Sequence, residues 1–491
     1  MELSNSTIFI DTGKRNTLHD IICVARKNAK VSVSAEVMKN LREAHDKVKS
    51  FIKSETSIYG LTTGLGSQKE IRLSEENLRN YNEAIIIEHA SAVGPEVSKD
   101  VIRATIFNRL YALAQGGSGI SPETFLALLN LLNADITPVV NKWGSVGEAD
   151  LGQLGQISLV LLGHGTAYIK GEKVSGSKAL EMAGLKPIIL QPRDALALIG
   201  TNSFSAAIAG LAIWDAQSYM DWSLKTTSLS WIAFKANPSQ LRSDVLTIRG
   251  NEVSEIGSRI QELISGIEYK PKSIQDPLSF RCVPHVQGAL LNYMNRFEIC
   301  VLDEVSNPLD NPFFKKETSE LISIGNFDPT QFTIECDALR NALFRTILLQ
   351  EKRVGKLLTT YFSGYPTGLA FQEGYAGFDV LHHTVLSLVG KVARLAQVTS
   401  PQFGMAAEGV EDYGAMATEA AQALEKMVQI WRLIIAIELT VATRALTFSS
   451  VTLKGPLKSL MEELTSLTVS LISPSEKVRA VENMIINKTT V

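Results

Sequence analysis

Four polar side chains in loops or at helix ends have the chemistry of an acid–base site. Tyr59 begins a glycine-rich loop, and a phenol acts there as a base only if its solution pKa of about 10 is lowered. Arg281 lies in a polar loop, where its planar guanidinium suits a substrate carboxylate as well as a protein carboxylate. His89 falls near a helix end and Glu411 closes a loop. The alternative for each of the four is a purely structural role, as a packed side chain, as the partner of another protein group or as the cap of a helix.

The segment Gly144–Leu154 is a tight loop that opens a helix. Its glycines permit turn conformations that other residues avoid, and apolar residues recur after Asp150 at the spacing of a buried helix. Asp150 stands at the expected N-cap, where its carboxylate accepts hydrogen bonds from the first amides. The positive end of the helix dipole would then face whatever the loop faces. The structural alternative is a junction that only shapes the core.

Helical periodicity dominates the elements that must position these residues. The short strand Ile8–Ile10 and a small hairpin at 163–171 are the main exceptions. We expect a mainly α fold with two parts, a loop-rich domain 1–200 carrying Tyr59 and the central loop, and a helical bundle 201–491. Several helices are apolar nearly all round, which implies burial inside an oligomer as well. The expected helical stretches are 18–29, 35–53, 74–132 (broken at 94–95 and 116–119), 192–301 (broken near 250 and 271–284), 333–398 (broken at 361–375), 415–446 and two or three after 453.

Composition indicates an ordinary soluble globular protein and excludes several classes of partner. The 491 residues are 45% hydrophobic and 20% charged, with a net charge of −3 and no basic stripe for nucleic acid. Four cysteines without CxxC spacing indicate neither a zinc site nor a disulfide framework. The most apolar helix, 430–442, contains Arg432 and Glu438 and is a poor membrane span. With no leader at the N-terminus, we expect a cytoplasmic protein.

Taken together, the loop motifs resemble those of the histidine and phenylalanine ammonia-lyase family, which includes aminomutases. Tyr-Gly-x-x-Thr-Gly-x-Gly starts at Tyr59, His-Ala-x-x-Val-Gly at His89, and Arg-Leu-x-Ala-Leu-Ala-x-Gly-x-Ser-Gly at Arg109. Gly-Ser-Val-Gly, Gln-Asp-Pro-x-Ser-x-Arg-Cys, Gly-Asn-Phe and Glu-Asp follow in order. The resemblance covers nearly the whole chain. It implies an elongated, mostly helical subunit and a homotetramer in which loops of three subunits build each active site.

The resemblance also implies roles for the residues that match the motifs. Tyr59 would be the base that removes a β-proton from the substrate. A histidine-like substrate is expected, because a carboxylate and a histidine suit the two nitrogens of an imidazole. The implied substrate contacts are Arg281 for the carboxylate, Gln275 for a polar contact, Phe327 beside the site, and His89 and Glu411 for the imidazole ring.

One departure from the family pattern concerns its cofactor. The family's methylidene-imidazolone forms from an internal Ala-Ser-Gly, but only Glu148 and Ala149 lie between Gly147 and Asp150. We therefore expect no cofactor. Four further family positions differ: the asparagine that supports the cofactor is missing or displaced to Asn202, Tyr111 replaces an asparagine, Leu278 a tyrosine and Val410 a glutamine.

A substrate with a quaternary nitrogen would not need that cofactor, because it can leave as neutral trimethylamine once the β-proton is removed. Among family members, the ergothionase type carries out this reaction without the cofactor. We therefore expect ergothioneine to be converted to thiourocanate, or hercynine to urocanate. Glu148 would act in catalysis or offset the charge of the cation, and aromatic faces would hold it. Candidate aromatic residues are Tyr111, Tyr361, Phe362, Tyr365, Phe371 and Tyr375.

Two alternatives stay open. The first is a cofactor-free ammonia-lyase or aminomutase acting on another amino acid, with Glu148 as acid or base and with Asp379 and His382 contacting a basic side chain. For that pair, a helix surface or a subunit contact is the structural alternative. The second is a non-catalytic relative that binds a ligand or a partner subunit, although a pure scaffold needs neither Tyr59 nor Arg281.

Overall fold

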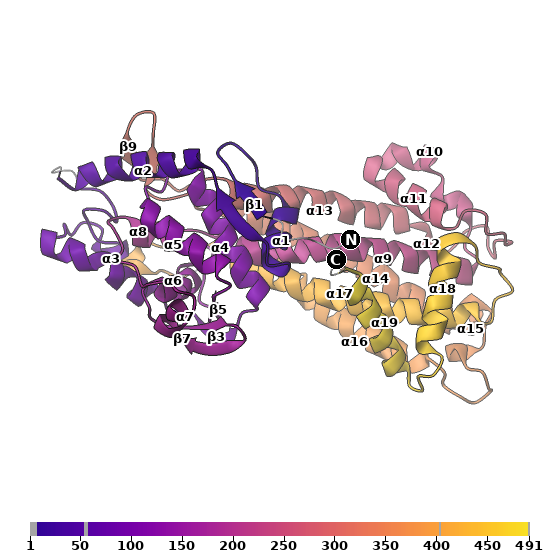
Figure 1. Ribbon diagram of the computed structural model, residues 1–491. Helices are drawn as coiled ribbons and strands as arrows, with labels where there is room; N and C mark the ends of the chain where they lie inside the picture. The colour runs from indigo at the N-terminus through magenta and orange to yellow at the C-terminus, as the bar shows by residue number, and fades with distance from the viewer. Residues whose placement is uncertain (1–6, 54–56, 402–403, 490–491) are drawn as a thin grey trace. The chain divides into compact units, whose positions relative to one another are not determined.

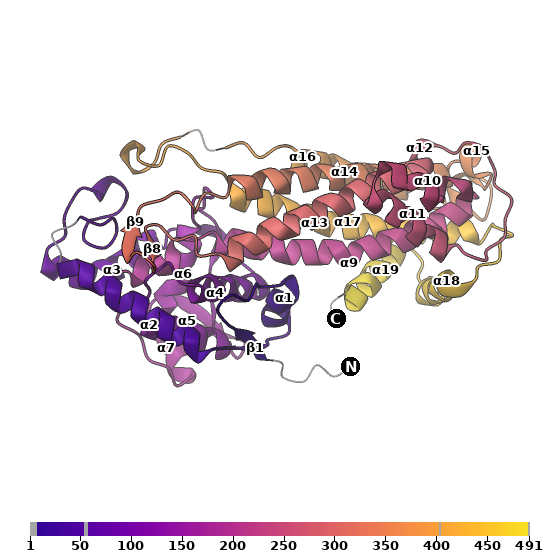
Figure 2. The same ribbon diagram turned by 90° about the horizontal axis from the view of Figure 1, so that it is seen from above.

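The structure is a computed structural model that describes residues 7–53, 57–401 and 404–489 (Figures 1 and 2). The expected domains 1–200 and 201–491 differ from the compact units of the structure, because two later segments pack with the N-terminal part. The units have these bounds: unit 1 is 1–211, 298–334 and 399–422, and unit 2 is 212–297, 335–398 and 423–491.

Unit 1 is built around α6, the helix that follows the central loop. It packs against α3, α5, α7 and α8, and its side chains Leu154, Ile157 and Val160 are almost completely buried. The predicted buried helix is therefore confirmed. The helices confined to unit 1 are α1 (Leu18–Arg26), α2 (Ala35–Ser50), α3 (Glu75–His89), α4 (Lys99–Ala114), α5 (Pro122–Asn133), α6 (Leu151–Leu161), α7 (Gly176–Met182) and α8 (Asp194–Ile199).

The strands are short and belong to small sheets in unit 1. The expected strand at 8–10 is confirmed as β1 (Thr7–Ile10), which pairs in parallel with β2 (Lys30–Val33). A hairpin is present as β6 (Thr166–Ile169) and β7 (Glu172–Ser175), but only its first strand and its turn lie within the predicted residues 163–171. The other strands show no alternating pattern in the sequence, because most have two or three residues and β3 contains Gly94 and Pro95. They are β3 (Val93–Glu96) paired with β5 (Asn141–Trp143), β4 (Thr137–Pro138) beside β6, and β8 (Phe313–Lys315) paired with β9 (Glu320–Ile322).

Long helices make the fold mainly α, as predicted. Four of them cross the boundaries between the units, and within unit 2 they lie side by side as a bundle (Figures 1 and 2). These four are α9 (Ser203–Phe234), α13 (Val283–Ser306), α14 (Thr330–Leu358) and α17 (Ala417–Leu446). Unit 2 also contains α10 (Ser243–Leu246), α11 (Asn251–Leu263), α12 (Leu278–Arg281), α15 (Thr360–Ser363), α16 (Asp379–Leu395), α18 (Gly455–Thr468) and α19 (Pro474–Thr489).

A buried ion pair lies in the core of the bundle in unit 2. Arg353 and Glu438 are both completely buried, and Arg353 Nε lies 2.6 Å from Glu438 Oε1. Ser230 Oγ also donates to Glu438, so the buried charges have the partners that burial requires. Only one described stretch, Asp194–Phe234, is long and apolar enough to cross a membrane, and 94% of its most apolar window is buried inside the structure, as in a core helix.

Candidate active site

The central loop adopts backbone conformations that most residues avoid. Gly147 has a φ of +88°, and a side chain there would clash with the backbone nitrogens of Met416 and Ala417. Ala149 has a φ of +94° although it is not a glycine. Strain of this kind persists only where the surroundings fix the backbone, and it is frequent at functional sites.

Asp150 stands at the N-cap position of α6, but it does not cap the helix as predicted. Its side chain makes no capping hydrogen bond. The carboxylate instead accepts hydrogen bonds of 2.8 Å from the hydroxyls of Ser145, Ser205 and Thr418 and from the Ser205 amide. A fully buried carboxylate takes the donors that converge on it, and here they come from the central loop itself and from the starts of α9 and α17. Burial raises the pKa of Asp150, and these bonds oppose the rise.

Glu148 is the polar side chain that this loop presents beside Asp150. Its Oε1 accepts a 2.8 Å hydrogen bond from the amide of Ala415. Burial raises the pKa of Glu148 to about 7, the bond from Ala415 opposes the rise, and the negative charge of Asp328 adds to it. The carboxyl group therefore titrates in the neutral range, where it can bind a cation or exchange a proton.

The side chain of Asn202 links the central loop to Phe327, which the sequence analysis singled out, and to Glu304, which it did not. Its Oδ1 accepts a 2.9 Å hydrogen bond from the Ala149 amide. Its Nδ2 donates to the carbonyl oxygen of Phe327 at 2.7 Å and to Glu304 Oε1 at 3.0 Å. Asn202 thus joins the backbone of the central loop to the backbone of Phe327, and a role of these residues in a site stays a prediction.

Tyr59 is half-buried at the start of its loop. Its hydroxyl oxygen accepts a 3.1 Å hydrogen bond from the Gly66 amide, which fixes the position of the phenol in this loop. Gly60 allows the close packing of this turn on α8, since an added Cβ would lie 2.7 Å from Leu196 Cδ2.

Arg193 is a buried cation whose charge acts on Tyr59. Its guanidinium donates to the carbonyl oxygens of Ser118, Asn311 and Pro312. Burial lowers the pKa of Arg193 to about 10, while negative charge on Asp310 and Tyr59 opposes the change.

The loops that carry Tyr59 and Glu411 pack against each other. The 3-10 turn Gly66–Gln68 contacts the 3-10 turn Ala407–Gly409, and a Cβ added to Gly66 would lie 3.2 Å from Ala407 Cβ. Glu411 closes the second loop through a two-residue bridge with Ala406, and its side chain is exposed. An exposed carboxylate in this position is open to a ligand.

His89 is the last residue of α3 and its side chain is half-buried. Its Nδ1 lies 2.8 Å from the carbonyl oxygen of Ile85, so Nδ1 carries a proton and donates it to that oxygen. Gly155 of α6 lets the helix approach this segment closely, because an added Cβ would lie 2.9 Å from the backbone nitrogen of Ala90. The backbone at His89 and Ala90 is thereby held beside α6.

Arg281 and Gln275 form a pair within unit 2. In the amide orientation that satisfies both groups, the Gln275 oxygen accepts from Nη1 and Nη2 of Arg281 at 2.6 and 3.2 Å. Among the described residues, the buried Nε of Arg281 has no hydrogen-bond partner. Arg353 donates to the carbonyl oxygen of Ser279 in α12 at 3.2 Å, so the buried ion pair also supports the short helix that ends at Arg281.

Comparisons with known proteins decide the family. The model of the aromatic amino acid lyase family matches residues 16–466. The chain belongs to the aromatic amino acid lyase family. The histidine ammonia-lyase of Symbiobacterium thermophilum is 31% identical over 89% of this chain and 88% of its own, and that of Desulfotalea psychrophila is 31% identical over 96% and 92%.

A solved structure also matches the full length of this aromatic amino acid lyase. It is the ergothioneine-degrading enzyme ergothionase of Treponema denticola, in complex with desmethyl-ergothioneine sulfonic acid. The TM-score is 0.94 with 25% sequence identity, and the match covers 99% of this chain and 100% of that chain. The expected membership of the ammonia-lyase family and its helical fold are confirmed.

Tyr111 of this lyase has partners inside the core of unit 1. It is 1% exposed, its hydroxyl donates to the carbonyl oxygen of Lys14 at 2.6 Å, and its ring meets Phe107 edge to face. Burial, followed by the charges of Asp20 and Asp11, raises the pKa of Tyr111 to about 12. A role for Tyr111 in holding a cation stays a prediction.

The aromatic stretch in unit 2 already surrounds a protein cation. The Arg444 guanidinium carbon lies 3.2 Å from the ring centroid of Phe371 and 5.4 Å from that of Phe378. Tyr365 is buried and its hydroxyl donates to the carbonyl oxygen of Ala233. Tyr361 and Tyr375 remain largely exposed, so they are the rings of this stretch most open to a ligand.

Asp379 and His382 have different surroundings within unit 2. His382 Nε2 lies 2.9 Å from Glu351 Oε1, and its ring lies against Gly355. Asp379 is exposed in the first turn of α16. His382 is thus held by a protein carboxylate.

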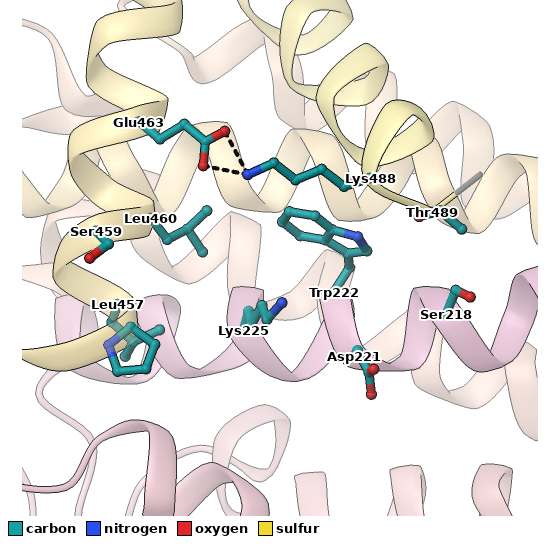
Figure 3. Close-up of a pocket in the computed structure, with 11 residues that line it drawn as sticks. Ser218, Asp221, Trp222, Lys225, Leu457, Ser459, Leu460, Glu463, Lys488 and Thr489 are labelled. Carbon is teal, nitrogen blue, oxygen red and sulfur yellow. Dashed lines mark hydrogen bonds and ion pairs between the residues drawn. The ribbon is translucent and has the colours of Figure 1, made fainter. Parts of the chain in front are cut away.

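A cavity of about 590 Å³ in unit 2 lies between α9, α18 and α19 (Figure 3). Its charged groups are engaged within the protein, because Glu463 pairs with Lys488 and Lys225 lies over the ring of Trp222. None of the predicted site residues lines it. Over residues 7–53, 57–401 and 404–489, no group of three or more His, Cys, Asp or Glu side chains could hold a metal ion.

Two site residues, Glu304 and Arg193, escaped the sequence analysis. Burial raises the pKa of Glu304 to about 7, and Asp150, Asp328 and Glu148 add to the rise against the bond from Asn202. The sequence contains one signal for Glu304. It is an acidic residue in the last turn of a helix, where the negative end of the helix dipole disfavours a carboxylate. No comparable pattern marks Arg193.

Proposed function

We propose that the chain is a carbon–nitrogen lyase that needs no electrophilic cofactor and eliminates trimethylamine from a histidine-derived betaine. The observation that carries the proposal is Glu148 in the central loop. Between Gly147 and Asp150 there is no serine to lose water and no glycine whose amide could attack, so the residues present do not fit the formation of methylidene-imidazolone. A carboxylate in that loop attracts a quaternary ammonium group, which no electrophile can capture.

The proposed reaction is a 1,2-elimination in which Tyr59 is the base. The phenolate removes the β-proton of the betaine, the C–H electron pair forms the Cα=Cβ double bond, and the Cα–N bond breaks. Trimethylamine leaves as a neutral molecule with the electron pair of that bond, and Tyr59 keeps the proton. The Gly66 amide donates to the Tyr59 hydroxyl oxygen and so holds the proposed base in place.

The remaining matched residues would bind the substrate in the same proposal. Arg281 binds the carboxylate, for which its unpartnered buried Nε is an available donor, and Gln275 holds the guanidinium. His89 and Glu411 bind the imidazole, with His89 Nε2 accepting from the ring N–H. Phe327 flanks the site. In the proposed homotetramer, loops of three subunits complete each site.

The comparisons support a histidine-derived substrate without choosing its leaving group. Relatives at 31% identity are named histidine ammonia-lyase, and the matching crystal structure is of an enzyme that degrades ergothioneine. The names of these relatives make ammonia elimination from histidine the second candidate. The central loop favours the betaine, either ergothioneine or hercynine.

A side-by-side incubation with ergothioneine, hercynine and histidine tests the proposal. We expect a rise in near-ultraviolet absorbance from a conjugated imidazole acrylate, with trimethylamine released from a betaine and no ammonia from histidine. Tyr59→Phe should lower kcat by about 10²–10⁴-fold, because general base catalysis is removed, while the ligand still binds. The matched control Tyr168→Phe, on the exposed hairpin, should keep full activity.

Three outcomes would contradict the proposal. Ammonia released from histidine would show that the chain activates a primary amine, so the second candidate would replace the first. Undiminished turnover in Tyr59→Phe would remove Tyr59 from the role of base. A chain that binds the betaines but converts none of the three compounds would fit the non-catalytic alternative.

A further inference from the structure

Asn202 has every hydrogen-bonding group of its amide engaged. It is 1% exposed and lies directly before α9. The oxygen accepts from the Ala149 amide, and the nitrogen donates to Glu304 and to the carbonyl oxygen of Phe327. Both partners of the nitrogen are oxygen acceptors, so the amide can present only its oxygen to Ala149.

Ala149, whose amide donates to Asn202, has a strained backbone conformation. Ala149 has a φ of +94°, a region that L-residues with a Cβ avoid. A second contact holds the adjacent residue, because Ala415 donates to Glu148 Oε1. Asn202, directly before α9, therefore holds the backbone amide of Ala149. Ala415, shortly before α17, holds the carboxylate of Glu148.

We propose that Glu304 is a positioning residue, which orients Asn202 and thereby holds Ala149 in its left-handed conformation and Glu148 in place. Glu304 lies in the last turn of α13, where the negative end of the helix dipole disfavours a carboxylate. The presence of a carboxylate at this unfavourable position is explained by the hydrogen bond that it accepts from Asn202 Nδ2. The role of Glu148 in catalysis rests on the proposed function, whereas the hold on Ala149 does not.

Hydrogen exchange at the Ala149 amide tests the hold directly and needs no substrate. In Glu304→Leu, this amide should exchange about tenfold faster or more, because Asn202 is free to turn away. In Glu304→Gln, protection should persist, since the glutamine oxygen can accept the same bond. The control Asp303→Asn lies one residue earlier in α13 and bonds Arg15 instead, so it should match the unaltered protein. Equal exchange in Glu304→Leu and in the unaltered protein would overturn the proposal.

Kinetics on the converted betaine test the consequence for catalysis. Glu304→Leu should lower kcat about 100-fold by misplacing Glu148, with KM changed less than threefold. Ala149→Gly should restore part of this loss, because glycine adopts a positive φ without strain. A raised KM with an unchanged kcat would instead make Glu304 a direct contact of the substrate. If no compound is converted, the proposed function fails, and hydrogen exchange still decides the positioning role.

Discussion

At the scale of single residues, the central feature is a group of carboxylates around the loop that precedes α6. Asp150 is fully satisfied by serine and threonine donors, so it serves the fold. Glu148 and Glu304 have fewer donors, and burial raises the pKa of each to about 7. Three carboxylates at one loop therefore divide into one structural group and two that titrate near neutral pH.

The raised pKa of Glu148 predicts how betaine affinity depends on pH. The carboxyl group is mostly protonated at pH 5.5 and ionised at pH 8.5, so attraction for a quaternary ammonium group grows as the pH rises through about 7. Titration calorimetry in a Tyr59→Phe background measures the dissociation constant without turnover. In that background, Glu148→Gln should weaken binding about tenfold at pH 8.5 and flatten the pH dependence.

A control and a contradicting result complete this test. Glu172→Gln, on the exposed strand β7, should leave the pH dependence of affinity as it was. Betaine binding that is equally strong in Glu148→Gln at both pH values would remove Glu148 from the cation site.

At the scale of elements, the close contact of α6 with the end of α3 depends on two glycines. An added Cβ on Gly152 would lie 3.0 Å from the Ala92 nitrogen, and one on Gly155 would lie 2.9 Å from the Ala90 nitrogen. Backbone cannot move aside as a flexible side chain does. The helix that follows the central loop therefore also fixes the segment that begins at His89.

Substitution Gly155→Ala should separate α6 from this segment. We expect a loss of about 1–3 kcal/mol in the free energy of unfolding, because the added methyl group overpacks the contact. The KM for the converted substrate should rise, since His89 moves with the end of α3. Urea unfolding and steady-state kinetics measure the two effects.

The matched control is Gly210→Ala in α9. There an added Cβ would have its nearest neighbour, Val301 Cγ1, at 3.5 Å, so the methyl group fits and helix propensity improves stability by about 0.5–1 kcal/mol. Equal stability of Gly155→Ala and the unaltered protein would contradict the prediction, because it would show that α6 and α3 accommodate the added methyl group without loss of stability.

At the scale of the whole molecule, α16 is apolar on more than one face. Leu381 and Val385 are buried inside unit 2, whereas Val380 is 61% exposed and Leu386 is 45% exposed. A helix that is apolar beyond its buried stripe indicates a further surface to cover. This supports the proposed association of the chain with copies of itself.

Light scattering should therefore give a mass of four chains of 53.6 kDa, about 214 kDa. The double variant Val380→Glu/Leu386→Lys should lower that mass, because charges oppose burial of the face. Circular dichroism must show unchanged helix content for the comparison to hold. A monomeric mass for the unaltered protein would contradict the tetramer.

The sequence by itself determined the helices, the family motifs and the content of the central loop. These features are local, because a helix shows its period within a few turns and a motif within a dozen residues. It also named Asn202 and Phe327, which a hydrogen bond joins in the structure, although their role in a site stays a prediction. Strands of two or three residues, such as β4 and β8, were too short to show a periodic pattern in the sequence.

Only the tertiary structure decided which groups each side chain meets. Asp150 looked like a helix cap, but its carboxylate takes donors from Ser205 and Thr418, which lie 55 and 268 positions further along the chain. The partnership of Glu304 with Asn202 likewise joins the end of α13 to the start of α9. Such partners depend on where long helices end in space, and the spacing of apolar residues along one helix carries no information about the end of another.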